Sequence, residues 1–356
     1  MEDWKHWYPN KMHKVNYVKA VEFNYPSWIP CEISIFPAVR IKYGEALEDI
    51  ILKYPFIFGK YKKGVVKLMK LPKYHRPDTY NRDNWDCLWY TSKGGYEGQV
   101  VEHPLENWSN FNTYSPPDPK KYSERGRNHW FLARLGFWVA RRKGMLIPGT
   151  GERLFDRLYF LRGFKNLMID IATDSPKITE LVNMLTEHEL KLIKLWLKLN
   201  VDIIYFHTDI GTQSRLMIPP AKFRKHIKPM FTKLFQTCRK EGVIVYLSSD
   251  GNLLEIVDDL IESGVSIHDP QVRACTLEGI KKHYKGKMCI DLDLDRQLFP
   301  FATPAQIKKH IKESVELLNT SEGGFMMKAE FSDTNIPLEN IEATCEAFME
   351  FCFPRA

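Results

Sequence analysis

The sequence lacks the features of several protein classes. Its seven cysteines are an odd number, are scattered along the chain and form no Cys-x-x-Cys pair. This argues against a disulfide framework and against a zinc site built on paired thiolates. No apolar run reaches the roughly eighteen residues that a membrane span requires, and the first residues have no apolar stretch of the signal-peptide type. We therefore expect reduced thiols, a cytoplasmic location and no membrane partner.

Long blocks of one charge are also absent. The formal net charge is +7 over 356 residues, and the densest basic runs are residues 60–63 and 141–143. Such short runs are typical of a solvated surface, so we expect no nucleic-acid partner. A basic rim suited to an anionic substrate or an acidic partner protein is left open.

From about residue 150 onward, short apolar runs alternate with segments of helical periodicity. The expected strands are residues 201–206, 243–247, 265–268, 288–292 and 323–330. The expected helices are residues 175–199, 221–240, 253–263, 276–284, 304–319 and 337–351. Strands that are apolar throughout and alternate with helices indicate a parallel sheet with both faces buried. No Gly-x-Gly-x-x-Gly follows a strand, which disfavours a doubly wound sheet. We predict an α/β fold, a single (β/α)₈ TIM barrel over residues 1–356.

The first part of the chain has a different composition. We expect an N-terminal extension at residues 1–25, helices near 14–23 and 44–53, and a strand at 30–36. Residues 72–130 are rich in tryptophan and tyrosine and predict an insertion, with a hairpin near 85–101, that covers the barrel mouth like a lid.

Several ordered segments carry a family resemblance. These are residues 153–167, 207–213 (His-Thr-Asp-Ile-Gly-Thr-Gln), 216–229, 249–252, 300–304, 323–325 and 337–341. In order and spacing they resemble the uroporphyrinogen decarboxylase superfamily. The region of residues 27–37 lacks the arginine-rich motif with which true uroporphyrinogen decarboxylases grip propionates. The chain is therefore more similar to the corrinoid-dependent methyltransferase branch.

That resemblance implies a cytoplasmic enzyme that takes a methyl group from a methoxylated compound and passes it to the cob(I)alamin of a corrinoid protein. The substrate is expected to be an aromatic methyl ether, the cofactor is cobalamin held by the partner, and a homodimer is left open. Two alternatives stand beside it. One is a metal-independent decarboxylase or lyase acting on a small acid, and the other is a non-enzymatic corrinoid-binding scaffold.

In the thiol-methylating members of the family, zinc is held by a His-x-Cys pair after the fifth strand and a cysteine after the eighth. Here Ser248, Asp250 and Glu330 stand at or near those positions. The resemblance therefore implies a Zn²⁺ site, if there is one, with oxygen and nitrogen ligands. His207, Asp250 and Glu330 are the candidate metal ligands.

Other polar residues at strand ends complete the candidate site, because strand ends meet at the mouth of a barrel. The candidate catalytic residues are Asp209, Asp250 and Glu330, and the candidate substrate-binding residues are Glu32, His268, Trp85 and Gln213. Each has a structural alternative. The histidines could be core residues, the two aspartates could bond only turn backbone, Glu330 could pair with Lys328 or an arginine, and the tryptophans could be packing in the lid.

Overall fold

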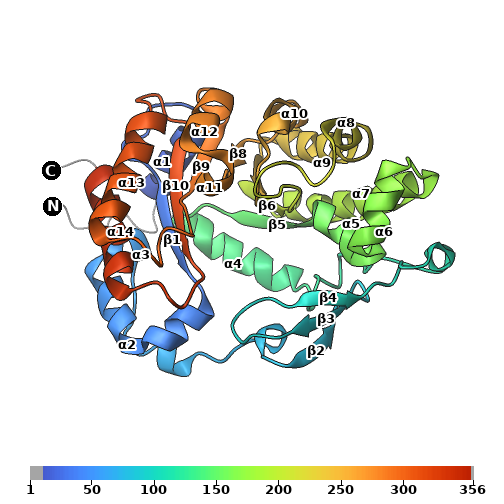
Figure 1. Cartoon of the computed structure of the whole chain (residues 1–356), viewed down its shortest axis with the longest axis horizontal. Helices are drawn as coiled ribbons and strands as arrows, with labels where there is room; N and C mark the ends of the chain where they lie inside the picture. Colours follow the sequence, from blue (N-terminus) through green and yellow to red (C-terminus); the bar gives the residue numbers. More distant parts are fainter. Residues whose placement is uncertain (1–10, 354–356) are drawn as a thin grey trace.

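A curved parallel sheet forms the centre of the protein. The structure, a computed structural model, describes residues 11–353. Within them, seven parallel strands pair in the order β1-β10-β9-β8-β7-β6-β5. Their bounds are β1 Cys31–Ile35, β5 Pro148–Arg153, β6 Ile203–His207, β7 Ile244–Ser248, β8 Ile267–His268, β9 Cys289–Asp293 and β10 Phe325–Phe331. Figure 1 shows the strand direction turning from β1, nearly vertical, to β5, nearly horizontal. The predicted barrel-type α/β fold is confirmed.

The register of the sheet brings the ends of the strands level. β6 and β7 pair from Ile203 with Ile244 to His207 with Ser248. Their apolar side chains are buried on both faces of the sheet, because helices cover one face and the barrel interior the other. The polar residues that follow each strand therefore meet at one edge, as parallel strands require.

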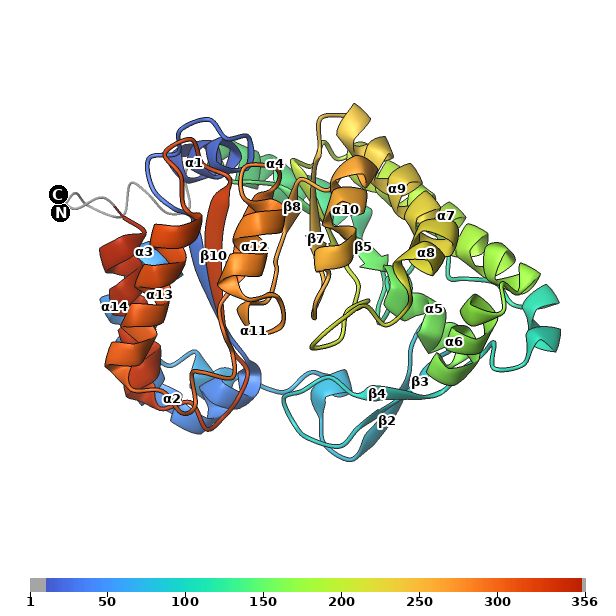
Figure 2. The same cartoon turned by 45° about the horizontal axis from the view of Figure 1, so that its top comes forward.

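Helices cover the outside of the sheet (Figure 2). Their bounds are α1 Lys11–Val21, α2 Pro37–Lys53, α3 Pro55–Phe58, α5 Leu154–Arg162, α6 Phe164–Ala172, α7 Pro176–Leu197, α8 Pro220–Lys222, α9 Lys228–Lys240, α10 Val257–Ser263, α11 Val272–Cys275, α12 Leu277–Tyr284, α13 Pro304–Leu318 and α14 Leu338–Phe351. A π-helical turn, Phe223–Ile227, joins α8 to α9. Local sequence starts several of these helices. In α13, for example, Thr303 before the helix and Gln306 in its first turn form a capping box.

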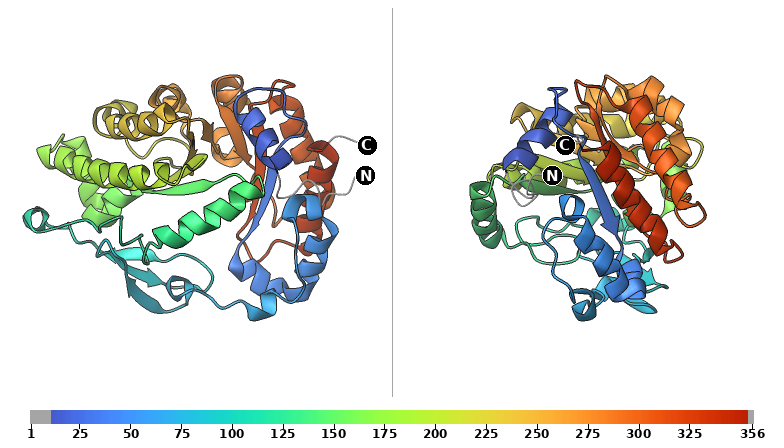
Figure 3. Two further views of the ribbon diagram at one scale, coloured as in Figure 1. Left: turned by 180° about the vertical axis from the view of Figure 1, so that it is seen from behind. Right: turned by 90° about the vertical axis from the view of Figure 1, so that its left-hand side faces the viewer.

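The sheet has two free edges. No strand of residues 11–353 pairs with the outer side of β1 or of β5, where the second strand of a closed barrel would lie. Helix α4 (Trp130–Arg142) lies alongside β5 instead, as Figures 1 and 3 both show. It packs on α7 through Trp130, whose ring centroid is 4.7 Å from that of Trp196. This helix was not among those predicted from the sequence.

The aromatic-rich segment forms a small antiparallel sheet. Its strands are β2 Thr79–Arg82, β3 Leu88–Thr91 and β4 Gln99–Glu102. The loop between β3 and β4 reaches the carboxyl ends of the barrel strands. There Tyr96 donates a hydrogen bond to the Ser332 carbonyl at 2.8 Å, and Glu97 pairs with Arg153 at 2.7 Å. The segment thus lies beside the mouth, and its role as a lid stays a prediction from the sequence.

Among the described residues, no helix combines the length and apolar character needed to cross a membrane.

Candidate functional site

Two connected cavities lie inside the barrel, the larger at the carboxyl ends of the strands and the smaller extending toward their amino ends. The larger has a volume of about 740 Å³ and the smaller about 520 Å³. His207, Ser248, Lys328 and Glu330 line both, so the two form one continuous space around the centre of the barrel. The larger cavity extends toward β5, α7 and the aromatic-rich insertion, and the smaller one reaches β1 and α1.

Lys328 on β10 stands at the centre of this space. Its ammonium group contacts the carboxylate of Asp269, which is only 3% exposed. Asp269 also accepts hydrogen bonds from the Ser248 hydroxyl at 2.7 Å and the Ser249 backbone N–H at 3.0 Å. Burial opposes the charge on Lys328, but Asp269, Asp291 and Asp293 outweigh burial and raise the pKa of the lysine. Lys328 is therefore a fixed cation rather than a free base.

Arg296 ties three carboxylates together on the neighbouring side. It lies 2.6 Å from Asp293, 2.8 Å from Glu330 and 3.5 Å from Asp250. Burial nevertheless raises the pKa of both Asp250 and Glu330, against the opposing charge of Arg296. One guanidinium cannot neutralise three carboxylates, so protons bind more readily here than to ordinary acids.

Along the rim, three aspartates follow one another. The carboxylate of Asp156 accepts the backbone N–H of Asp209 at 3.0 Å, and the carboxylate of Asp209 accepts the backbone N–H of Asp250 at 3.1 Å. The Tyr159 hydroxyl donates to Asp156 at 2.7 Å. Burial, and then the charge of Asp209, raise the pKa of Asp156 to about 7. Asp156 can therefore hold or release a proton near neutral pH.

The larger cavity has more acids than bases. Among the described residues that line it, seven are carboxylates and three are Lys or Arg. The acids are Glu97, Glu124, Glu152, Asp156, Asp209, Asp250 and Glu330, and the bases are Arg153, Arg296 and Lys328. The chain as a whole carries a formal charge of +7, so the acidity of the cavity does not follow from composition.

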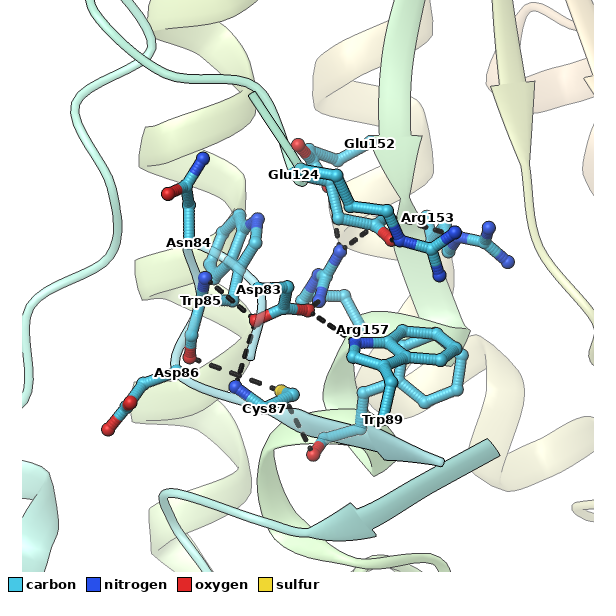
Figure 4. A network of polar contacts seen from close by, with 12 residues as sticks. Asp83, Asn84, Trp85, Asp86, Cys87, Trp89, Glu124, Glu152, Arg153 and Arg157 are labelled. Atoms are coloured by element: carbon cyan, nitrogen blue, oxygen red, sulfur yellow. Dashed lines mark hydrogen bonds and ion pairs between the residues drawn. The ribbon is translucent and has the colours of Figure 1, made fainter. Parts of the chain in front are cut away.

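A buried arginine anchors the insertion to the barrel beside this cavity (Figure 4). Arg157 on α5 has no exposed side-chain surface and lies 2.9 Å from Glu124, 3.2 Å from Glu152 and 3.4 Å from Asp83. Asp83 in turn accepts the backbone N–H groups of Trp85 and Cys87 and the indole N–H of Trp89 at 2.8–2.9 Å. The charges hold the wall that carries Glu124 in place.

The structure brings some of the predicted site residues together and separates others. Those that line the cavities are His207, Asp209, Asp250 and Glu330 in the larger one and Glu32, His207 and Glu330 in the smaller one. Trp85, between β2 and β3 of the insertion, is completely buried, and His268 is completely buried against Tyr284, with ring centroids 5.5 Å apart. Gln213 is exposed on the loop after β6. None of these three lines either cavity.

The candidate metal ligands do not fit a metal centre. No group of three or more His, Cys, Asp or Glu in residues 11–353 is arranged to hold an ion. Glu330 is paired with Arg296, and Asp250 accepts the Gln271 side-chain N–H at 2.9 Å. The arginine pairing is the structural alternative that the sequence left open for Glu330. In residues 11–353, His207, Asp250 and Glu330 therefore do not form a zinc centre.

Three residues of the site were not among the candidates: Asp156, Arg296 and Lys328. Asp156 follows β5, and the glycine-rich segment before it, Pro-Gly-Thr-Gly, did not resemble a buried strand. Lys328 lies within β10, in a parity that points into the barrel. A charged residue inside an apolar strand was the one signal that could have identified it.

Comparison with known proteins agrees with this fold. The family model described as uroporphyrinogen decarboxylase (URO-D) matches residues 96–351. A methyltransferase from Methanosarcina mazei superposes with a TM-score of 0.61 at 15% sequence identity, covering 96% of this chain and 99% of that one. A D-psicose 3-epimerase from Clostridium cellulolyticum gives a TM-score of 0.39 at 10% identity, covering 64% and 86% of the two chains. No curated protein sequence matches the chain.

Proposed function

Because this chain belongs to the uroporphyrinogen decarboxylase family, we propose that it is a methyltransferase that removes the methyl group of a methoxylated compound and passes it to a corrinoid protein. The fold likeness to a methyltransferase along nearly the whole chain supports this proposal. The corrinoid would be carried by the partner, which docks over the open mouth, so this chain needs no binding site that encloses it.

The observation that carries the proposal is the set of protonatable carboxyl groups at the mouth. In ether demethylation, the bond between the methyl carbon and the ether oxygen breaks, and the departing oxygen takes up a proton. The cob(I)alamin of the partner supplies the electron pair that forms the new bond to the methyl carbon. A proton donor with a pKa near the working pH lowers the barrier for such a departure.

Asp156 fits this role best, because its pKa is about 7 and it lines the larger cavity. Asp209 would keep the Asp156 proton in place through its own negative charge, the second cause of the raised pKa after burial. Asp250 and Glu330, whose pKa values burial also raises, would supply further protons. In the described residues no zinc-type ligand group takes the place of these acids.

The decarboxylase alternative has less support from the charges. A small acid brings a carboxylate into a cavity where carboxylates already outnumber bases, and Arg296 and Lys328 are both occupied by aspartates. Like charges at close range disfavour such a complex.

The test mixes the purified chain, a reduced corrinoid protein and a set of aromatic methyl ethers that are cationic, neutral or anionic. We expect methyl-cobalamin and a phenol from at least one ether, and loss of both products with Asp156→Asn. Release of carbon dioxide from a small acid, with no methyl transfer from any ether, would refute the proposal and support the lyase.

A further inference from the structure

The larger cavity is lined by more carboxylates than basic side chains, so its lining has an excess of negative charge. Asp156 is 3% exposed, so water does not solvate its carboxylate as it does on a surface. A buried charge without a partner is costly, so an unpaired buried carboxylate tends to bind either a proton or a cation. The chain as a whole has a formal net charge of +7, so the shortage of basic side chains at this cavity is a local feature.

The carboxylates of the wall and those of the floor differ in their pairing. On the wall, Arg153 and Arg157 contact Glu97, Glu124 and Glu152. On the floor, Arg296 and Lys328 face Asp250, Asp269, Asp291, Asp293 and Glu330, and the Asp156–Asp209–Asp250 row lies next to them. The negative charge left over therefore lies at the rim of the floor.

A second observation, independent of the acids, points to a ligand in the same cavity. His188 on α7 lines it and is 3% exposed; the Pro117 backbone interacts with the ring, but no donor among residues 11–353 reaches a ring nitrogen. Burial lowers the pKa of His188 to about 4, so the ring is neutral and offers a lone pair. A buried acceptor without a donor is costly, and a ligand N–H would satisfy it.

Aromatic side chains complete the lining. Tyr122 and Trp196 face the larger cavity, and the Trp196 indole N–H donates to the Thr150 carbonyl at 2.8 Å, which fixes the ring. Faces of aromatic rings attract organic cations. Acids, a neutral imidazole and aromatic rings together match an ammonium group attached to an apolar body.

We propose that the substrate of this site is an organic cation, a methylated compound that carries an ammonium nitrogen, held by the carboxylates of Asp209 and Asp250. The proposal rests on the methyltransferase function above and names the class of its methyl donor. It favours a cation over the anionic substrate that the basic composition of the chain left open.

Binding to the full chain tests the proposal without methyl transfer. Calorimetric titration at pH 7 would compare para-methoxybenzylamine, para-methoxybenzyl alcohol and para-methoxybenzoate, which share a ring and an ether and differ in charge. We expect the ammonium to bind at least about tenfold more tightly than the alcohol, a ratio that corresponds to about 1.4 kcal/mol, and the benzoate to bind most weakly.

Two variants locate the effect. Asp209→Asn and Asp250→Asn should each reduce the preference for the ammonium over the alcohol by about tenfold. The alcohol serves as the internal control, because a misfolded variant loses both ligands. Glu316→Gln, on an exposed carboxylate of α13 that pairs with Lys312 at 3.7 Å, is the matched control and should leave the preference unchanged.

The two proposals fail separately. If the ammonium does not bind more tightly than the alcohol, or if the aspartate variants weaken all ligands equally, the cation assignment is wrong, whatever the methyl-transfer assay shows. If the ammonium binds as expected and no ether yields methyl-cobalamin, the cation site stands and the methyltransferase function fails.

Discussion

Replacing Asp156 with asparagine should stabilise the protein, and more so at high pH. The pKa of Asp156 is about 7 in the folded protein against a usual 3.8. Below pH 3.8 the acid is protonated in both states and costs nothing. As the pH rises from 3.8 toward 7, the unfolded chain releases the proton while the folded chain keeps it, so folding loses stability. The full loss is about 3 pKa units, or about 4 kcal/mol.

The asparagine side chain keeps an oxygen for the Asp209 N–H and the Tyr159 hydroxyl but does not titrate. Relative to the natural chain, the linkage predicts a gain of roughly 2 kcal/mol at pH 5 and roughly 4 kcal/mol at pH 8. Any constant cost of the substitution cancels in the difference of about 2 kcal/mol. Urea unfolding at pH 5 and at pH 8 measures this difference. Asp258→Asn, at an exposed carboxylate 3.1 Å from Lys287, should show no such difference. An equal effect of Asp156→Asn at pH 5 and pH 8 would refute the reasoning.

Three further substitutions test the buried charges. Arg157→Met leaves Asp83, Glu124 and Glu152 without their shared cation, and thermal or urea unfolding should show a loss of about 3–5 kcal/mol; a loss below about 1 kcal/mol would contradict the anchoring role. Lys328→Met should cost a similar amount because Asp269 stays buried, and adding Asp269→Asn should recover part of the loss, whereas no recovery would mean that the lysine acts through packing alone. His268→Phe should be neutral or stabilising by about 1 kcal/mol, because neither ring nitrogen has a partner in residues 11–353; a loss above about 2 kcal/mol would reveal a hydrogen bond that these contacts do not show.

The regular part of the fold could be predicted from the sequence. The strand expected at residues 243–247 is β7, Ile244–Ser248, and the helix expected at 304–319 is α13, Pro304–Leu318. Both carry their own signals, a wholly apolar run in one and a capping residue before helical periodicity in the other. The family resemblance over residues 150 to 356 is confirmed by the match to residues 96–351.

The strand expected at residues 30–36 is the edge strand β1, Cys31–Ile35, but the other edge, β5, could not be predicted in this way. β5 contains Pro148, Gly149 and Gly151, which local preference assigns to a turn. Both glycines are needed, because a Cβ at Gly151 would lie 2.4 Å from the Phe206 ring and one at Gly149 would lie 2.9 Å from Trp196. Close packing between segments far apart in the chain is invisible to local pattern.

Only part of the candidate site could be predicted, because the other part depends on contacts between segments far apart in the chain. His207 and Glu330 lie near the ends of β6 and β10, and Asp209 and Asp250 follow β6 and β7, so their meeting at the mouth follows from the fold alone. Whether a carboxylate is free or paired depends on partners from other elements. Arg296 comes from the loop after β9 and occupies Glu330, a residue of β10. The roles of the candidate residues therefore stay predictions until they are measured.

The free edges of β1 and β5 bear on how this molecule opens. In a closed ring each strand is held by two ladders of hydrogen bonds, whereas within residues 11–353 β5 is held by one, along β6. Separation of an edge strand breaks half as many backbone bonds, so local opening begins where the ring is interrupted. Amide protons of β5 should therefore exchange with solvent faster than those of β7. Since Thr150 and Gly151 of β5 also line the larger cavity, the same fluctuation would change the shape of that cavity at its wall.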